Sequence, residues 1–291
     1  MISKKLHGTG VALVTPFDNQ GEIDFLALKK LLRHTSQGVD YYVVMGTTGE
    51  SATLSKEEKK EVLQFVIANN IKKLPIVYGI GGNHTQGVVD EIRSTNLTSV
   101  DALLSVSPYY NKPSQEGIYQ HFVAVANASP IPIILYNVPG RTASNLTAET
   151  TLRLAKHKNI IGIKEASGSM EQCMKIAKEK TVDFLLISGD DMLTLSLYAI
   201  GGEGVISVLA NAYPVTFKKI KEYVHAGKLN RAQQEQFKLL EINAPMYEEA
   251  NPVGLKHLLK TMNIGNGDVR LPLVAASSAL QKKIETLVKK K

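Results

Sequence analysis

Short apolar runs rich in β-branched residues recur along the chain and alternate with polar segments of helical periodicity. Eight such runs occupy residues 10–17, 40–50, 74–82, 101–110, 131–140, 160–168, 183–191 and 204–211. Between them, segments such as 24–38 and 55–70 place apolar residues at the three- and four-residue spacing of an amphipathic helix. We expect Asp24 to cap the first of these helices, and Ser55 with Glu58 forms a capping-box pattern at the start of the second.

Strands that alternate with helices at this spacing predict parallel βαβ units. Eight units before about residue 215 favour a closed (β/α)8 TIM barrel, an α/β fold. The alternative is an open doubly wound sheet, which usually carries a phosphate-binding loop, but "GIGGNH" does not match G-x-G-x-x-G and no P-loop sequence occurs. The rest of the chain shows no strand pattern. We therefore expect a catalytic barrel over residues 1–214 and a C-terminal helical extension over 215–291 that packs on it as one structural unit.

The composition, 44% hydrophobic and 21% charged, is ordinary for a globular protein with a core. The net charge of +7 is not arranged as a basic stripe interleaved with aromatic residues, so we expect no nucleic-acid partner. No stretch reaches the ~18–20 apolar residues of a membrane span. The single cysteine, Cys173, permits no internal disulfide, which suits a reducing compartment. We therefore expect a cytoplasmic protein with no membrane partner.

In the sixth run, "IIGIKEASG", the apolar residues are followed by a charged amine, Lys164, which is costly to bury without a reason. The chemistry of a TIM barrel gathers at the C-terminal ends of its strands. Tyr136 ends the preceding predicted strand, and neighbouring parallel strands lie ~4.8 Å apart, so the amine and the phenol can meet at the barrel mouth. Partial desolvation inside a barrel favours the neutral amine that Schiff-base chemistry needs, and a phenol beside it can move protons.

Each of these two residues also has a structural explanation. Lys164 alone could extend from a strand end to solvent, and Tyr136 could be a core aromatic residue with a satisfied hydroxyl. Their adjacency, together with hydroxyl groups after the second and fourth runs, favours a catalytic site. The seven histidines form no H-E-x-x-H pattern or close pair, so we expect no metal site, and Asp190 with Asp191 is predicted to be a solvated turn.

Four motifs make the sequence similar to one enzyme superfamily: "GTTGESATL", "SPYYNKPSQEGIYQHF", "ILYNVPGRT" and "NIIGIKEASG". The chain resembles the pyruvate-dependent class I aldolases, which include dihydrodipicolinate synthases and N-acetylneuraminate lyases. The resemblance extends over nearly the whole chain and is closest to the dihydrodipicolinate synthases. It implies a lyase of lysine (diaminopimelate) biosynthesis that condenses pyruvate with L-aspartate 4-semialdehyde and uses no metal or separate cofactor.

The same resemblance implies catalytic roles. Lys164 would form the Schiff base with pyruvate, and Tyr136 would donate and accept protons, joined to Thr47 and Tyr110 in a relay. In this family the residue at the Tyr110 position reaches into the active site of the neighbouring subunit, so activity would require a tight dimer. The assembly implied is a homotetramer built as a dimer of tight dimers.

Substrate-binding residues follow from the resemblance as well. Thr48 would hold the pyruvate carboxylate, Ile206 would line the pyruvate pocket, and Gly189 would also belong to the substrate-binding set. Arg141 would bind the carboxylate of the semialdehyde, for which a bidentate guanidinium–carboxylate pair is well suited.

Two other functions remain open at this stage. The first is another 2-keto-acid aldolase, such as a sugar-acid lyase; Arg141 argues against it, because the sialic-acid lyases of the superfamily lack this arginine. The second is a degenerate module that binds pyruvate without catalysing a reaction. The sequence argues against it, because it retains the complete set of Lys164, Tyr136, Thr47 and Tyr110.

One departure from the family pattern concerns inhibition by lysine, the end product of the pathway. Lysine-sensitive members carry histidines where this chain has Lys56 and Lys59, and a glutamate where it has Gly87. The difference removes a carboxylate that would pair with the effector and adds two positive charges. We therefore expect weak or absent inhibition by lysine, the alternative being that Lys56 and Lys59 simply form the solvated face of their helix.

Overall fold

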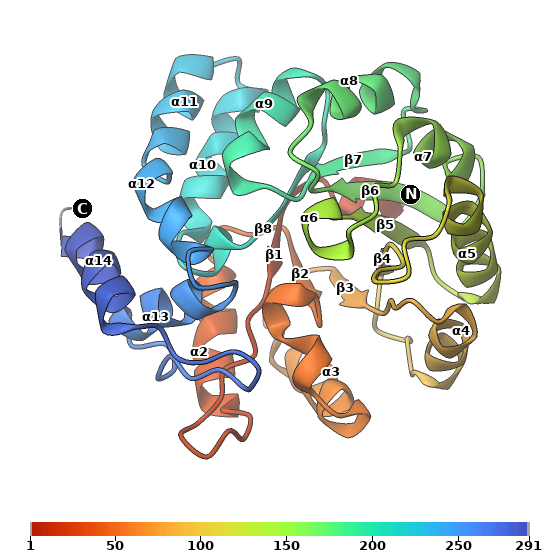
Figure 1. Ribbon diagram of the computed structural model, residues 1–291. Coiled ribbons are helices and arrows are strands. Elements are labelled where there is room, and N and C mark those ends of the chain that lie inside the picture. The colour runs from red at the N-terminus through yellow and green to blue at the C-terminus, as the bar shows by residue number, and fades with distance from the viewer. Residues whose placement is uncertain (1, 290–291) are drawn as a thin grey trace. The chain divides into compact units, whose positions relative to one another are not determined.

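The strands follow one another in chain order around a closed barrel, from β1 to β8 (Figure 1). The computed structural model describes residues 2–289. The strands are β1 (Gly8–Ala12), β2 (Tyr41–Val44), β3 (Ile76–Gly79), β4 (Ala102–Val106), β5 (Ile133–Asn137), β6 (Ile160–Glu165), β7 (Leu185–Ser188) and β8 (Gly204–Ser207). Each strand overlaps one of the apolar runs, and the predicted (β/α)8 barrel is confirmed.

Helices alternate with the strands and continue after the last of them. Up to β8 the helices are α1 (Ile2–Lys5), α2 (Phe25–Thr35), α3 (Lys56–Asn69), α4 (Thr85–Ser94), α5 (Gln115–Ala128), α6 (Pro139–Thr142), α7 (Ala148–Leu154), α8 (Met170–Glu179) and α9 (Thr194–Ala199). After β8 they are α10 (Pro214–His225), α11 (Leu229–Phe237), α12 (Leu240–Asn243), α13 (Val253–Thr261) and α14 (Ser278–Lys289). Short 3₁₀ helices are η1 (Thr47–Gly49), η2 (Ser51–Thr53), η3 (Asp191–Leu193), η4 (Leu209–Asn211) and η5 (Ala244–Met246).

Both helix starts predicted from the sequence are present. The Asp24 carboxylate accepts a hydrogen bond from the backbone N–H of Ala27 at 2.9 Å, which caps α2. At α3 the Ser55 hydroxyl accepts from the Glu58 N–H at 3.1 Å, and the Glu58 carboxylate accepts from the Ser55 N–H at 2.7 Å. This reciprocal pair satisfies two backbone donors that the first turn of a helix leaves without partners.

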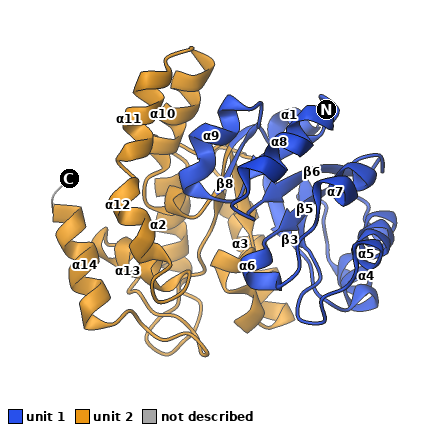
Figure 2. Ribbon diagram, turned by 45° about the horizontal axis from the view of Figure 1, so that its top comes forward, with its two compact units in different colours: residues 1–8, 75–206 blue, residues 9–74, 207–291 orange. Residues whose placement is uncertain are grey.

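The chain divides into two compact units, coloured separately in Figure 2. Unit 1 comprises residues 1–8 and 75–206, and unit 2 comprises residues 9–74 and 207–291. In unit 2, the described residues that follow β8 form helices and loops only. The expected boundary between a catalytic barrel and a C-terminal extension at residue 214 stays a prediction.

The strand register of unit 1 brings one row of residues onto one face of the sheet. Val106 pairs with Tyr136, Tyr136 with Lys164, Lys164 with Ile187, and Ile187 with Gly204. Residues paired in register point to the same side of a sheet, and neighbours along a strand point to opposite sides. This row therefore defines the face on which Tyr136 and Lys164 lie.

The strands of unit 1 are buried on both faces, as expected for a parallel sheet covered by helices. Residues 133–135 of β5 have no exposed surface. The helices contribute buried side chains of their own, such as Val88 and Ile92 of α4 and Phe122 of α5. Burial of each such side chain stabilises the fold by about 1.5–3 kcal/mol.

Among the described residues, no helix has the length and apolar character needed to cross a bilayer.

Candidate active site

Tyr136 and Lys164 lie at the carboxyl ends of β5 and β6 and face each other directly. They are register partners, and the Lys164 Nζ atom lies 4.3 Å from the centre of the Tyr136 ring. Both residues are only 6% exposed. The adjacency predicted from the strand ends is therefore present, with the amine held against the ring face by a cation–π contact. A buried amine beside a phenol has the groups that imine chemistry requires, a nucleophile and a proton carrier.

Gly189, just after β7, leaves the space that the Lys164 side chain occupies. A Cβ atom at this position would lie 3.1 Å from Lys164 Cε and 2.5 Å from Ala166 Cβ. The backbone N–H of Gly189 donates to the Glu165 carbonyl at 2.7 Å, which fixes the glycine beside the end of β6. Any larger residue at position 189 would displace the lysine or the strand end.

Behind the reactive pair, on the opposite face of the sheet, lies a buried carboxylate. Glu165, 3% exposed, accepts hydrogen bonds from Asn137 Nδ2 at 3.0 Å, Gln172 Nε2 at 2.7 Å and the Ser167 N–H at 2.6 Å. Asn137 follows Tyr136, and Glu165 follows Lys164, so these bonds join the two strand ends that carry the pair. Because Gln172 belongs to helix α8, this face points to the helical layer and the reactive face points into the barrel.

The loop after β5 carries Arg141, which the family resemblance predicts to be a substrate-binding residue. Asn137 anchors this loop through Oδ1, which accepts from the Leu146 N–H at 2.9 Å, and through Nδ2, which donates to Asn145 Oδ1 at 2.8 Å. The Ser144 hydroxyl donates to the Pro108 carbonyl at 3.0 Å. Arg141 itself lies in the short helix α6 and is exposed. The guanidinium is therefore carried on an anchored loop and is open to solvent.

Tyr110 lies in the loop after β4 and does not share the burial of Tyr136. It is 87% exposed and adopts a left-handed backbone conformation, with φ of 73°. The preceding residue, Tyr109, is held by a hydrogen bond from Asn83 Nδ2 to its carbonyl at 3.2 Å. A non-glycine residue in this region of φ carries strain that the surrounding structure must support. The ring of Tyr110 is thus presented outward on a constrained loop.

Ile206 in β8 belongs to the same face as Lys164. Lys164 pairs with Ile187 and Ile187 with Gly204, and Ile206 follows two residues later on the same strand. Ile206 has no exposed surface. An apolar side chain in this position is suited to line a pocket for a small substrate.

Thr47 and Thr48 form the first residues of η1, after β2 in unit 2. Thr48 is 3% exposed, and its hydroxyl accepts a hydrogen bond from Asn251 Nδ2 at 3.0 Å. The Thr15 hydroxyl donates to the Gly49 carbonyl at 2.7 Å and holds the end of the same turn. Asn251 was not predicted as part of the site; its only signal in the sequence is its place before the apolar and basic stretch "PVGLKH".

Asp190 and Asp191 differ from the solvated turn predicted for them. Asp190 accepts a hydrogen bond from the Met192 N–H at 2.8 Å and starts the 3₁₀ helix η3. Asp191, the first residue of this 3₁₀ helix, is 1% exposed, so the prediction was wrong for Asp191. Within residues 2–289, no group of three or more His, Cys, Asp or Glu side chains is arranged to hold a metal ion.

The chain is similar to known proteins in sequence and in structure. Residues 5–291 match the dihydrodipicolinate synthetase family. The chain is 50% identical over 280 residues to the 4-hydroxy-tetrahydrodipicolinate synthase of Cytophaga hutchinsonii. This alignment covers 96% of the present chain and 94% of that protein. It is 50% identical over 284 residues to the enzyme of the same name from Flavobacterium psychrophilum, covering 97% of each. The crystal structure of dihydrodipicolinate synthase from Aquifex aeolicus has a TM-score of 0.93 to this fold at 36% identity, covering 98% of both chains.

Proposed function

The chain belongs to the dihydrodipicolinate synthetase family, and from that premise we propose that it condenses pyruvate with L-aspartate 4-semialdehyde to 4-hydroxy-tetrahydrodipicolinate. The observation that carries the proposal is the buried amine of Lys164, 4.3 Å from the centre of the Tyr136 ring. A class I aldolase reaction needs such an amine, because the reaction begins with attack of a neutral nitrogen on a ketone.

In the first half of the reaction, the Lys164 amine attacks the keto carbon of pyruvate and forms a carbinolamine. Tyr136 protonates the departing oxygen, and water leaves to give an iminium ion. The iminium withdraws electrons from the adjacent methyl group, which gives a proton back to the Tyr136 phenolate and becomes the carbon nucleophile of an enamine. Proton transfers of this kind by a positioned side chain contribute typically ~10²–10⁴-fold to a rate.

In the second half, the enamine carbon attacks the aldehyde carbon of the semialdehyde, and the aldehyde oxygen takes a proton. The new carbon–carbon bond regenerates the iminium. The amino group of the former semialdehyde then attacks the iminium carbon, the ring closes, and Lys164 leaves as the free amine. One water is released in imine formation, and no oxidant, reductant or metal takes part in the balance.

Thr47 and Thr48 of unit 2 complete the proposed set of reacting groups. Thr47 would pass protons between Tyr136 and Tyr110. Thr48 would bind the pyruvate carboxylate, and its hydrogen bond supports that role: since the hydroxyl oxygen accepts from Asn251, its hydrogen is left for another acceptor. In unit 1, the apolar side chain of Ile206 suits the small body of pyruvate, and Gly189 would contribute by leaving room for the Lys164 side chain.

Arg141 would bind the carboxylate of the semialdehyde and so distinguish this substrate from a sugar acid. Its guanidinium is exposed on a loop that hydrogen bonds anchor on both sides. A planar fork of donors matches a carboxylate bidentately and is a strong, specific contact. A sugar-acid lyase would need neutral hydrogen-bonding groups for a polyol chain, which favours the semialdehyde.

The assembly we propose is a homotetramer built from tight dimers, in which Tyr110 of one subunit completes the relay of another. The outward presentation of Tyr110 on a strained loop supports this role, since a phenol in that position is available to a partner chain. A cytoplasmic location for this biosynthetic activity also stays a prediction.

A coupled assay with pyruvate and L-aspartate 4-semialdehyde, run beside N-acetylneuraminate cleavage, tests the proposed function. We expect turnover of the first pair and none above background for the sialic acid. Turnover of N-acetylneuraminate alone would assign the chain to the other branch of the superfamily. Borohydride reduction with pyruvate separates both enzymes from a mere binding module, because a binder without imine chemistry would not be labelled.

A further inference from the structure

The turn that carries Thr47 and Thr48 is held in a conformation that costs free energy. Met45 before it and Glu50 after it both adopt left-handed backbone angles, with φ of 61° and 53°. Such angles in non-glycine residues persist only where the surrounding structure over-determines them. The restraint on this turn must therefore come from contacts that its neighbours make.

Glu50 makes the contacts that provide this restraint. Its carboxylate is buried and forms an ion pair with the ammonium of Lys256, whose side chain is 4% exposed. The other oxygen of Glu50 accepts from the backbone N–H of Arg270 at 3.1 Å. Lys256 Nζ also donates to the Asp268 carbonyl at 2.8 Å and lies 4.0 Å from the centre of the Phe17 ring. Lys256 and Arg270, both in the C-terminal segment (residues 251–270), thus contact the two oxygens of a single carboxylate.

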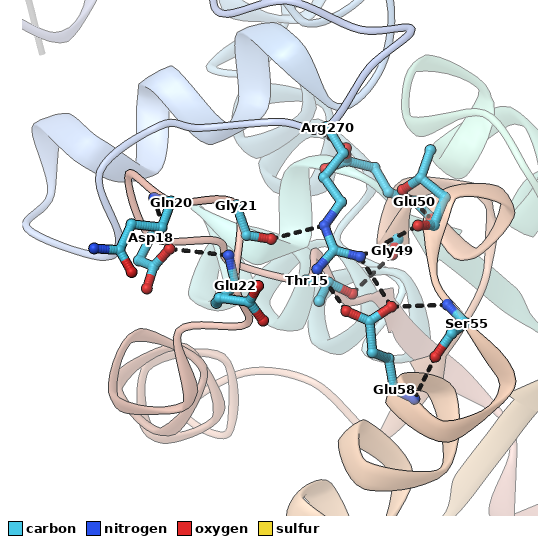
Figure 3. A network of polar contacts seen from close by, with 11 residues as sticks. Thr15, Asp18, Gln20, Gly21, Glu22, Gly49, Glu50, Ser55, Glu58 and Arg270 are labelled. Atoms are coloured by element: carbon cyan, nitrogen blue, oxygen red, sulfur yellow. Dashed lines mark hydrogen bonds and ion pairs between the residues drawn. The ribbon is translucent and has the colours of Figure 1, made fainter.

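Arg270 also binds the segments on either side of the turn, as Figure 3 shows. Its guanidinium donates to both carboxylate oxygens of Glu58, at 2.9 and 2.5 Å. It also donates to the Gly21 carbonyl at 2.8 Å and to the Thr53 carbonyl at 3.2 Å. It lies 4.5 Å from the centre of the Phe17 ring, the ring that Lys256 also contacts. The strained turn is therefore clamped to the start of α3 and to the loop before α2.

A buried ion pair is a poor device for stability alone, because well-packed apolar residues of similar volume often stabilise a fold as well or better. The Lys256–Glu50 pair therefore points to a requirement for geometry. We propose that Lys256 is a positioning residue of the active site, which through Glu50 holds Thr47 and Thr48 in the conformation that binds pyruvate. The inference rests on the proposed function.

A second contact from the same segment supports this assignment. Asn251 precedes α13, the helix that carries Lys256, and its Nδ2 donates to the Thr48 hydroxyl at 3.0 Å. Asn251 is itself buried. Residues 251–256 thus act on the turn in two ways. Asn251 orients the Thr48 hydroxyl directly, and Lys256 restrains the backbone of the turn through its ion pair with Glu50.

The acid–base behaviour of Lys256 supplies a signature that a structural role alone would not. Burial lowers the pKa of Lys256 to about 8, against the opposing effect of Glu50. The charged groups that face it are Glu50 from the turn, and Asp268 and Arg270 from the C-terminal segment. As the pH rises through about 8 the ammonium and its ion pair are lost, so the pyruvate KM should rise. Deprotonation of a nucleophilic amine favours imine formation and would lower the pyruvate KM as the pH rises. A pyruvate KM that rises with pH therefore has the opposite sign and distinguishes loss of the Lys256 ion pair from titration of the nucleophile.

The decisive variant replaces both partners, Lys256→Met with Glu50→Gln, so that no buried charge is left without a partner. Lys260→Met is the matched control, because Lys260 lies on the same helix α13 and is exposed. Melting temperature, pyruvate KM and kcat are measured for wild type, both single variants, the double variant and the control. Borohydride trapping at saturating pyruvate shows whether the nucleophile is still competent.

The double variant is expected to melt near the wild-type temperature and to form the adduct at saturating pyruvate, with a pyruvate KM raised at least about tenfold. Its KM should no longer depend on pH above about 8. A double variant with wild-type melting and a KM within about twofold of wild type would overturn the proposal and leave the pair a purely structural feature.

If the double variant does not fold, the wild-type profile decides. A pyruvate KM that stays flat from about pH 7 to about pH 9.5 would refute the positioning role, and a rise through that interval supports it. Failure of the proposed function is a separate result, since the wild-type enzyme would then give neither adduct nor turnover.

Discussion

Tyr136 and Lys164 are register partners at the ends of β5 and β6, and the Lys164 Nζ atom lies 4.3 Å from the centre of the Tyr136 ring. The strand pairing itself, rather than a flexible loop, brings the Lys164 amine to the Tyr136 phenol. Glu165 and Asn137, the next residue on each strand, hydrogen-bond on the opposite face at 3.0 Å and fix the same two strand ends. A pair that is held on both faces of a sheet can keep its geometry through a multistep reaction.

Replacement of Arg141 by alanine should weaken the second substrate and spare the first. Loss of one charge-assisted bidentate contact costs on the order of 2–4 kcal/mol, which corresponds to a roughly thirty- to several-hundred-fold rise in the semialdehyde KM. Pyruvate adduct formation should stay near the wild-type level. Arg153→Ala is the control, because Arg153 forms an exposed ion pair with Glu116 on the outer helices. Equal loss of pyruvate binding in Arg141→Ala would remove Arg141 from its assigned role.

The substitution Gly189→Ala should reduce activity by a steric clash that displaces the Lys164 side chain. The added methyl group would lie 2.5 Å from Ala166 Cβ and 3.1 Å from Lys164 Cε, so the lysine or the strand end must move. Misplacement of a reacting group by about 1 Å can cost about 10²-fold in rate. Steady-state kcat measures the effect, and Gly82→Ala, whose Cβ would make an ordinary 3.4 Å contact with Val88, is the matched control. Wild-type kcat in Gly189→Ala would show that the site does not need this space.

His121 should make the fold sensitive to acid. The ring lies buried between α5 and α4, with Nδ1 2.9 Å from the Thr85 hydroxyl, and burial lowers the pKa of His121 from 6.5 to about 4. The unfolded chain then binds a proton at a higher pH than the folded chain does, so the free energy of unfolding falls as the pH drops from about 6.5 toward about 4. The loss attributable to this histidine is about 2–3 kcal/mol.

Urea unfolding of wild type and His121→Gln at about pH 7 and about pH 4.5 measures this contribution. The variant should lose less stability than wild type between the two pH values, because glutamine does not titrate. Equal losses in the two proteins would assign the acid sensitivity to other groups.

Lysine should inhibit this enzyme weakly or not at all. The expectation rests on Lys56, Lys59 and Gly87, which differ from the lysine-sensitive pattern of the family. In unit 1, a Cβ atom on Gly87 would lie 2.9 Å from the His84 ring, so a longer side chain there would have to displace the histidine. A titration of the initial rate with lysine at neutral pH is the measurement, and half-inhibition below about 1 mM would contradict the expectation.

The sequence allowed the barrel and the reactive pair to be predicted because both follow from local patterns. Eight apolar runs at regular spacing predict the strands, and a lysine and a tyrosine at the ends of neighbouring runs must meet once the strands pair. The same reasoning should have found Glu165, a second charge at the end of the same run. Asp191 was misassigned because the burial of a residue after a strand end depends on how the folded chain packs, which composition does not reveal.

The contacts that hold the Thr47–Thr48 turn could not be predicted in this way. Asn251 reaches Thr48 across 203 residues of chain, and Arg270 reaches Glu58 across 212. Pairings at such separations depend on the complete fold, and a lysine in an amphipathic helix such as α13 is normally an exposed one. The positioning role of Lys256 therefore became visible only once its burial and its partner were known.

The proposed mechanism depends above all on Lys164 as the Schiff-base nucleophile. Reduction of the wild-type enzyme with borohydride in the presence of pyruvate, followed by proteolysis and mass spectrometry of the peptides, identifies the lysine that forms the imine. We expect a pyruvate-derived adduct on Lys164, absent from Lys164→Ala and present in Lys260→Ala, with all three proteins folded. An adduct on a different lysine, or turnover of pyruvate and semialdehyde by Lys164→Ala at the wild-type rate, would refute the assignment of Lys164.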